Sequence, residues 1–548
     1  MHSQNRSHGA KIFKTDRPVL KFPLLFLIAL AVMGQAAAAP YQVAEKDIAT
    51  LQADMAAGRV TSAGLVRAYI ARIDALDRKG PKLRSVIAVN PNAIADAMAL
   101  DAERKAKGPR GPLHGIPILV KDNIETADPM PTTAGSLALA GNLTHRDAPL
   151  VARLRAAGAI ILGKTNLSEW ANFRSSHSIS GWSGIGGLTK NPYVLDRSPC
   201  GSSAGSAVAV AASLAAAAIG TETNGSLVCP GSVNGIVAFK PTLGRVSRTH
   251  VVPISHSQDT AGPMARTVAD AAAILNAMSG RDAADAATAD ADARKTDFAA
   301  LSGASLRGKR LGVVMAPPQS PLSETDRLLA KALEALKARG AEIVLVSDFA
   351  VPPQIGDDER LVLQYDFKND LNLYLASLPA SPIRSLSDLI AFNDASPRET
   401  ALFDQNTFIA ANARGDLASP EYVRARDELI SLAAKTLDDA LRRYRLEALI
   451  RITTEPAFRI DTVRGNNFGG GDAASLPAEA GYPHLTVPMG TVQGLPVGLS
   501  FIGPAWSDAR MLALGHAFEQ ASPARKAPNF LPSLEETVSA ENAFAPVH

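Results

Sequence analysis

The stretch from Ser198 to Ser247 constrains this chain more than any other. It holds two clusters of small polar residues, GSSAG at 201–205 and TNGS at 223–226. Residues 207–219 between them carry no charge and almost no polarity, which predicts a buried helix. Glycine lets backbone amides approach a ligand closely, and hydroxyls beside such turns are candidate nucleophiles. One cluster is typical of an ordinary turn, whereas two clusters around a buried segment indicate a site.

The composition is that of a globular protein. Of its residues, 46% are hydrophobic and 20% are charged. The length of 548 residues is enough for one large domain or for two to three ordinary ones. The net charge of +3 is too small to indicate nucleic acid or an anionic membrane surface as partner. We therefore expect neither.

The N-terminus follows a different pattern. Basic residues precede the apolar run 22–33, and alanines follow at 36–39. This order predicts a secretory signal peptide over residues 1–38, with Pro40 disfavouring cleavage directly after Ala39. The alternative is an uncleaved interfacial anchor. We expect an exported protein, periplasmic or extracellular, with no stable membrane association after cleavage.

The chain has two cysteines, Cys200 and Cys229, so no disulfide framework holds the fold. They flank the two serine clusters, and export would permit a bond between them. The sequence leaves open whether that bond forms.

Strand and helix patterns alternate along the chain, which predicts an α/β fold. We expect one large domain in which helices sandwich a mixed, mostly parallel twisted sheet. GIPILVK at 115–121 predicts a buried strand that ends in Lys121. Taken alone, such a lysine is more typical of a strand end that reaches solvent. The predicted parts are a helical segment 41–108, a core 109–280, a linker 281–300, a helix-rich segment 301–465 that shapes substrate access, a return to the core 466–525 and a tail 526–548.

Two short motif matches and one function class without a motif are alternatives to a catalytic site at both clusters. Residues 158–165 match the phosphate-loop pattern, but residues 159–162 are themselves predicted to be a strand, so we reject nucleotide binding. The GSSAG cluster fits a G-x-S-x-G elbow with Ser203 as an esterase nucleophile and His484 or His516 as base, although no buried strand precedes it. A non-catalytic exported binding protein, in which the clusters only pack against a ligand, is a further alternative.

Longer motifs resemble the amidase signature family. They are GIPILVKDN at 115–123, GKTNLSEWANF at 163–173, residues 198–247, QDTAGPMARTVADAA at 258–272 and AGYPHLTVPMGTVQGLPVGLSFIG at 480–503. The resemblance covers nearly the whole predicted mature chain. Within the family, the predicted signal peptide together with SEWANF, SPCGSS and ISGWSG is most similar to bacterial peptide amidases.

This resemblance implies an amidase with a Ser-Ser-Lys triad and with neither cofactor nor metal. Carried over to this sequence, Ser226 is the nucleophile, Ser202 the bridging serine after a cis peptide bond, and Lys121 the base. A serine hydroxyl needs a base to become nucleophilic, and burial lowers the pKa of a lysine so that it can act as one. The resemblance thus reverses the solvent-facing interpretation of Lys121.

The backbone N–H groups of Thr223, Asn224 and Gly225 are the expected oxyanion hole. Two departures from the family pattern are present. Glu222 and Asn224 replace the usual Asp and first Gly before the nucleophile, and a side chain at Asn224 should narrow the pocket or bond to substrate. The sequence RIT at 451–453 replaces the usual Ala-Pro-Thr.

The expected reaction is release of ammonia from peptide C-terminal amides by a monomer. A broader aryl or aliphatic amidase is the alternative within the family.

Overall fold

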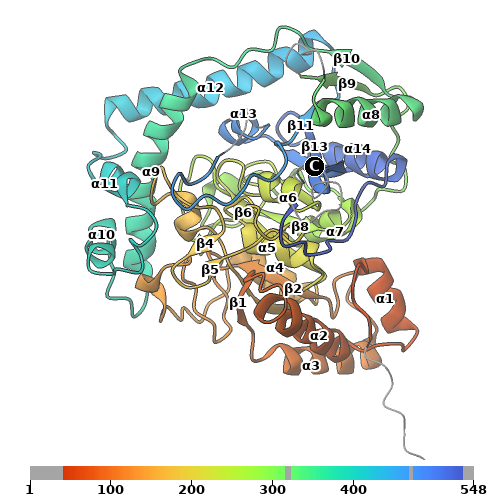
Figure 1. Cartoon of the computed structure of the whole chain (residues 1–548), viewed down its shortest axis with the longest axis horizontal. Coiled ribbons are helices and arrows are strands. Elements are labelled where there is room, and N and C mark those ends of the chain that lie inside the picture. The colour runs from red at the N-terminus through yellow and green to blue at the C-terminus, as the bar shows by residue number, and fades with distance from the viewer. Residues whose placement is uncertain (1–40, 315–321, 468–472, 535–548) are drawn as a thin grey trace, which may run out of the picture. The chain divides into compact units, whose positions relative to one another are not determined.

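An eleven-stranded mixed sheet forms the centre of the fold (Figure 1). The computed structural model describes residues 41–314, 322–467 and 473–534. The predicted signal peptide lies outside these residues. In spatial order the strands are β1 (Val86–Val89), β3 (Ile160–Thr165), β2 (Pro117–Lys121), β6 (Ala217–Glu222), β8 (Thr260–Ala265), β7 (Val237–Lys240), β12 (His484–Val492), β13 (Leu495–Ile502), β11 (Ala448–Ile452), β9 (Arg310–Val313) and β10 (Glu342–Leu345).

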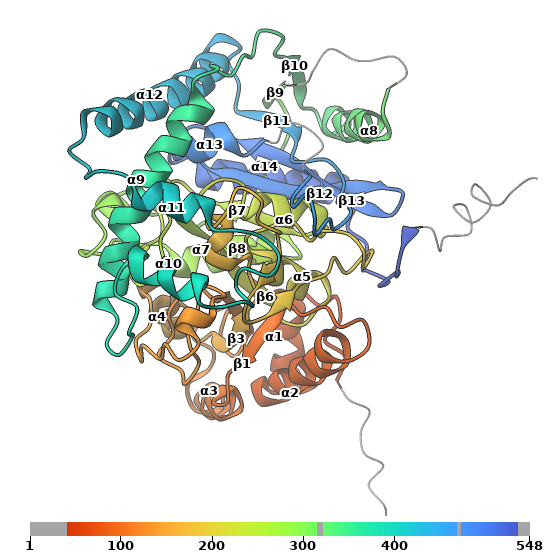
Figure 2. The same cartoon turned by 60° about the vertical axis from the view of Figure 1, so that its left-hand side comes forward.

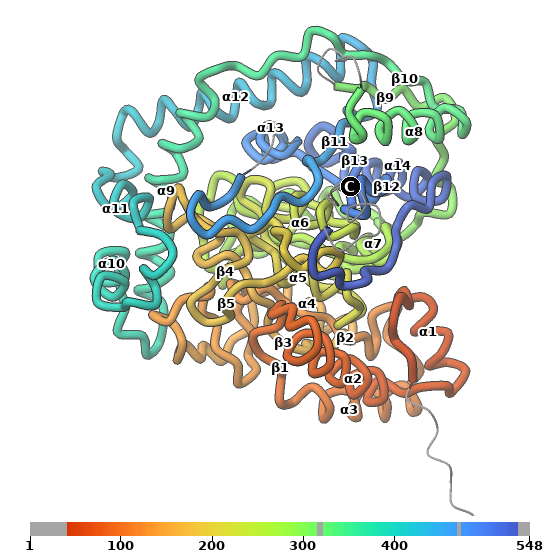
Figure 3. The backbone as a smooth tube through the Cα atoms, in the orientation of Figure 1, coloured from red at the N-terminus to blue at the C-terminus, as the bar shows by residue number. Residues whose placement is uncertain are grey.

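The predicted α/β domain with a mixed sheet is confirmed. Parallel pairing occurs in two blocks, β3-β2-β6 and β11-β9-β10, and the other neighbouring pairs are antiparallel. The parallel character expected of the sheet therefore holds within these blocks. Two strands from late in the chain, β12 and β13, lie between β7 and β11 in the sheet. Figure 3 shows both of them in blue near β11.

Helices lie on both faces of the sheet. The α-helices of the described residues are α1 (Ile48–Ala56), α2 (Ser62–Arg72), α3 (Ala93–Lys107), α4 (Pro149–Ala156), α5 (Ala204–Ala211), α6 (Val228–Val233), α7 (Val268–Met278), α8 (Glu324–Ala338), α9 (Ile355–Ser377), α10 (Leu386–Asp394), α11 (Asn406–Asn412), α12 (Pro420–Arg443), α13 (Ser475–Glu479) and α14 (Asp508–Ala521). On β12, Thr486 lies against α6, whereas its neighbours Leu485 and Val487 lie against α14. Successive side chains of a strand point to opposite faces, so α6 and α14 cover opposite faces.

The apolar run at 207–219 is not one helix. Helix α5 ends at Ala211, Ser213 takes a positive φ of 54°, and β6 begins at Ala217. The run is long enough for a helix, but pairing of its second half with β2 and β8 determines the outcome. This corrects the predicted buried helix, while the burial itself is confirmed.

Several predicted parts show more structure than their sequences suggested. The N-terminal helical segment also contains β1, which pairs with β3. The segment predicted as a linker, 281–300, buries Phe298 in the main core. Within the predicted tail, Leu531 pairs with the backbone beside Val194, since its carbonyl accepts from the N–H of Leu195 at 2.8 Å.

Helices α9 to α12 follow one another as a group beside the sheet (Figure 2). They contribute to two apolar clusters apart from the main core, one around Phe367 and Phe408 and one around Val362 and Leu429. Helix α9 also reaches the loops that follow β6, where the candidate site lies.

Candidate active site

Lys121, at the end of β2, lies at the bottom of the candidate site. Its side chain is fully buried. The Nζ atom lies 2.7 Å from Ser202 Oγ and 2.8 Å from Thr221 Oγ1, and it also contacts the Thr221 carbonyl at 3.3 Å. Asn123 Nδ2 donates to the same Thr221 hydroxyl at 3.0 Å. The lysine is therefore not a strand-end charge in solvent, and three oxygen atoms surround its amine.

Burial controls the charge of this amine. Loss of solvation lowers the pKa of Lys121 from 10.5 to about 7, and the negative charges of Asp259 and Glu222 limit the fall. A lysine with this pKa is neutral in half of the molecules near pH 7. It can therefore accept a proton from a hydroxyl that touches it.

Ser202 and Ser203 precede α5 and differ in their contacts. A cis peptide bond joins Gly201 to Ser202, as the family resemblance implied. Ser202 is fully buried and touches the lysine amine. The Ser203 hydroxyl instead donates to the Thr221 carbonyl at 2.9 Å and accepts from the Thr221 N–H at 3.2 Å. Both hydrogen-bond partners of the Ser203 hydroxyl are backbone groups of Thr221, so we assign this hydroxyl a structural role.

Ser226 lies in the turn between β6 and α6. Gly225 adopts a positive φ of 78°, which suits glycine, and the N–H of Ser203 donates to the Ser226 carbonyl at 3.2 Å. The Glu222 carboxylate accepts from the N–H of Leu227 at 2.7 Å, and its contacts include the Gly225 N–H. The glutamate that replaces the family's aspartate thus holds the turn around Ser226.

Ser226 opens onto a cavity of about 310 Å³. The whole predicted oxyanion loop lies on its wall, and so does Leu363 of α9. Thr454 lines it as well, just after the sequence 451–453 that departs from the family pattern. The other lining residues are Ala171, Asn172, Phe173, Cys200, Gly201, Cys229, Ile254 and Ser475.

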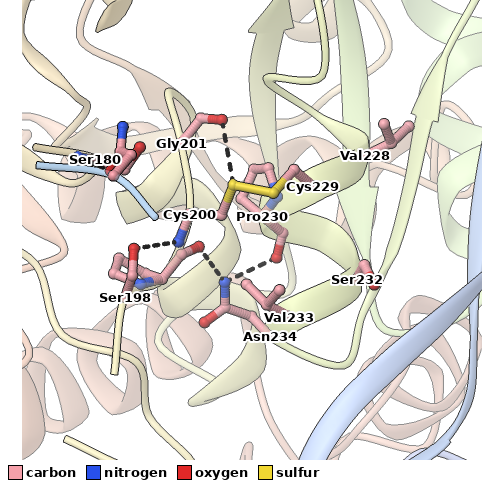
Figure 4. Close-up of a disulfide and its surroundings, with 12 residues drawn as sticks. Ser180, Ser198, Cys200, Gly201, Val228, Cys229, Pro230, Ser232, Val233 and Asn234 are labelled. Atoms are coloured by element: carbon pink, nitrogen blue, oxygen red, sulfur yellow. Dashed lines mark hydrogen bonds between the residues drawn. A yellow bond between two sulfur atoms is a disulfide. The ribbon is translucent and has the colours of Figure 1, made fainter. Parts of the chain in front are cut away.

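A disulfide joins the two serine loops (Figure 4). It connects Cys200, two residues before Ser202, with Cys229, three residues after Ser226, and the two Cα atoms lie 6.0 Å apart. The sequence left this bond open, and the structure contains it. Because both cysteines line the cavity, the bond is part of the site wall.

The residues of the competing motifs lie in other environments. Lys164, from the phosphate-loop match, is at the end of β3 and donates to the Ile124 carbonyl at 2.6 Å and to Thr132 Oγ1 at 2.8 Å. His484 Nε2 is hydrogen-bonded to Ser500 Oγ at 2.6 Å, and burial lowers the pKa of His484 to about 3. His516 lies 3.7 Å from Glu519. Neither histidine forms a hydrogen bond to Ser203 within the part of the chain that the structure describes.

A polar network holds the loop before Ser226, and its members were not identified from the sequence. Asp259 accepts from Thr223 Oγ1 at 2.5 Å, and Gln258 Nε2 donates to the Thr223 carbonyl at 3.3 Å. Burial raises the pKa of Asp259 to about 6. Glu359 of α9 accepts from Gln258 Nε2 at 2.9 Å and from Asn224 Nδ2 at 2.7 Å. Gln258 and Asp259 lie in a motif quoted above, but nothing in the helical pattern distinguishes Glu359 from a surface glutamate.

Residues 41–314, 322–467 and 473–534 lack two further features. No group of three or more His, Cys, Asp or Glu side chains there is arranged to hold a metal ion. No helix there is long and apolar enough to cross a membrane.

Comparison with known proteins identifies the family. The amidase family model matches residues 64–512. This chain belongs to the amidase signature family. A probable amidase of Arabidopsis thaliana is 38% identical over 507 residues, which are 90% of this chain and 93% of the relative. The family relationship therefore extends over nearly the whole length of both chains.

Solved structures show the same relationship. The native peptide amidase of Stenotrophomonas maltophilia is 52% identical, has a TM-score of 0.85, and is covered over its whole length by 90% of this chain. An amidase family protein of Bacillus anthracis is 35% identical with a TM-score of 0.81, covering 89% of this chain and 93% of that protein. The chain is therefore an amidase, a serine hydrolase of this family, whose structure is close to that of a peptide amidase.

Proposed function

We propose that this amidase hydrolyses carboxamides through an acyl-enzyme, with Ser226 as nucleophile, Ser202 as proton relay and Lys121 as base. The contact of 2.7 Å between Lys121 Nζ and Ser202 Oγ carries the proposal, because it joins a base with a pKa of about 7 to a buried hydroxyl. The Ser226 loop is hydrogen-bonded and disulfide-bonded to the Ser202 loop, which supports transfer between the two hydroxyls.

Proton transfers through Ser202 connect the two halves of the reaction. Neutral Lys121 takes the Ser202 proton as Ser202 takes the proton of Ser226, whose oxygen attacks the amide carbon. Ser202 then gives a proton to the departing nitrogen and recovers one from the Lys121 ammonium, so that ammonia leaves an ester on Ser226. Water attacks this ester, its proton passes to Lys121 by the same route, and Ser226 recovers its hydrogen as the acid leaves.

The backbone N–H groups of Thr223, Asn224 and Gly225 stabilise the oxyanion of each tetrahedral intermediate. The N–H of Asn224 has no hydrogen-bond acceptor among the residues that the structure describes, which supports its part in the hole. The Gly225 N–H faces Glu222, so we assign the larger share to Thr223 and Asn224. No metal or cofactor enters this mechanism.

The substrate we propose is the C-terminal amide of a peptide. The similarity to the Stenotrophomonas peptide amidase supports this choice. A second solved structure at 52% identity is described as that peptide amidase in complex with the competitive inhibitor chymostatin. The cavity beside Ser226 has walls from α9 and from loops near Phe173 and Ile254, so the helix-rich segment 301–465 contributes to substrate access. A broader aryl or aliphatic amidase remains the alternative.

Ammonia release tests the proposal directly. The purified mature chain is incubated with amidated peptides, the same peptides as free acids, and simple aryl and aliphatic amides. We expect ammonia from the peptide amides, with none from the free acids and none from Ser226→Ala at unchanged circular dichroism. An active Ser226→Ala would contradict the triad, and turnover of simple amides alone would favour the broader amidase.

We also propose export as a soluble monomer, without nucleic acid as partner. The basic, apolar and small-residue order of residues 11–39 and the disulfide between Cys200 and Cys229 support export. N-terminal sequencing of the protein secreted by its host should begin at Ala39. A mature chain that keeps residues 1–38 would contradict the signal peptide.

A further inference from the structure

We propose that Glu359 fixes the side-chain amide of Asn224 so that Asn224 Oδ1 faces the cavity and accepts a hydrogen bond from the NH₂ group of the substrate carboxamide. The inference rests on the proposed function only in that the substrate is a primary amide. It assigns Asn224 as a specificity residue and Glu359 as a positioning residue that acts through it.

The oxygen and the NH₂ group of an asparagine side chain have nearly the same size and shape, but the first accepts hydrogen bonds and the second donates them. The hydrogen-bond partners around Asn224 therefore determine which way its amide faces. Its Nδ2 lies 2.7 Å from Glu359 Oε1 and 3.4 Å from Ser475 Oγ. A carboxylate oxygen accepts and does not donate, so the NH₂ end of the amide faces Glu359. Both hydrogens of Nδ2 then have acceptors on α9 and α13.

A second amide converges on the same carboxylate oxygen. Gln258 is buried, and its Nε2 lies 2.9 Å from Glu359 Oε1 and 3.3 Å from the Thr223 carbonyl. Two amide donors on one oxygen require that oxygen to act as an acceptor. Glu359 is thereby held by Gln258, and the orientation of Asn224 follows from both.

The remaining oxygen of Asn224 is available to a ligand. Among the described residues, Asn224 Oδ1 has no hydrogen-bond partner, and Asn224 lines the cavity next to Ser226. An acceptor at this place fits the NH₂ of a carboxamide, which has two donors. A carboxylate product has none, and it would bring a negative charge toward both Oδ1 and Glu359.

The substitution Glu359→Gln tests the inference, because a glutamine can donate. Its NH₂ end can face Asn224, which then turns its own NH₂ toward the cavity. We expect kcat/KM for the amide to fall about three- to ten-fold, as loss of a hydrogen bond predicts. We expect the acid product to bind more tightly, with its competitive inhibition constant lowered by a similar factor. Asn224→Ala should show the loss for the amide without the gain for the acid.

Asp357→Asn is the matched control, since it removes the same charge from the same helix. Asp357 is exposed and pairs with Arg360, so this variant should change neither quantity. Weaker amide turnover together with weaker acid binding in Glu359→Gln would show a merely structural role and overturn the inference, as would no change in either.

The outcome is separable from that of the proposed function. If the wild type turns over only simple amides, the same comparison is made with such an amide and its acid. The peptide assignment then fails, while the role of Asn224 is still tested.

Discussion

Replacing Lys121 by methionine should remove activity and make the protein more stable at neutral pH. Methionine has a similar length and needs no solvation, whereas the lysine is fully buried. The pKa of Lys121 falls from 10.5 to about 7 through loss of solvation. At about 1.4 kcal/mol for each pKa unit, the charged lysine lowers the unfolding free energy by about 5 kcal/mol.

The sign of the pH dependence follows from proton binding. Between pH 7 and 10 the unfolded lysine keeps its proton, while the folded lysine has lost it. The unfolded state thus binds more protons, so the stability of the wild type rises with pH across this range. The advantage of Lys121→Met should be largest below about pH 7 and should nearly vanish near pH 10.5. Lost hydrogen bonds to Ser202 and Thr221 add an offset that does not depend on pH.

Urea unfolding of both proteins at about pH 6, 8 and 10 measures this difference. In parallel, kcat/KM of the wild type should rise with pH through an apparent pKa near 7. Lys240→Met is a control, because burial lowers the pKa of Lys240 to about 8 and we assign it no catalytic part. It should show a similar stability trend and keep the kinetic limb. A stability difference for Lys121→Met that is equal at pH 6 and pH 10 would refute the reasoning.

Three further outcomes are expected. Mass spectrometry of unreduced protein should show the Cys200–Cys229 bond, and its reduction should lower kcat/KM because it joins the two serine loops; two free thiols would contradict this. Asp259→Asn should move the acidic limb of kcat/KM to lower pH, since Asp259 raises the pKa of Lys121, and an upward shift would argue against this pairing. Arg174→Met leaves the buried carboxyl groups of Glu169 and Glu399 without the cation that contacts both. It should lower the unfolding free energy in urea titrations by about 3–5 kcal/mol, and a loss below about 1 kcal/mol would contradict this expectation.

The sequence predicted those elements whose signals are local. Within the predicted helical segment 41–108, the Thr61 side chain caps α2 by accepting a hydrogen bond from the Gly64 N–H. The strand that ends in Lys121 also appears as predicted. The proposed triad residues Lys121, Ser202 and Ser226 lie within long continuous motifs, so the resemblance to a family could identify them.

Elements that form by pairing with segments distant in the sequence were harder to predict. Strand β8 contains Gly262 and Pro263, residue types that are typical of turns, yet it runs from Thr260 to Ala265 between β6 and β7. Likewise, pairing on both sides turns the end of the 207–219 run into β6. Glu359 could not be found from the sequence, because its importance comes from facing Asn224, 135 positions away.

The position of β12 has a consequence for how activity returns after denaturation. Every residue of the proposed triad precedes position 230, but β7, which follows the Ser226 turn, pairs on its far side with β12 from position 484 onward. A nascent chain that has emerged only as far as α12 leaves β7 as an open sheet edge. Contacts between such distant segments form slowly. Catalytic turnover should therefore return only after the hairpin of β12 and β13 has paired with β7. Recovery of ammonia release would then report one of the last steps of refolding.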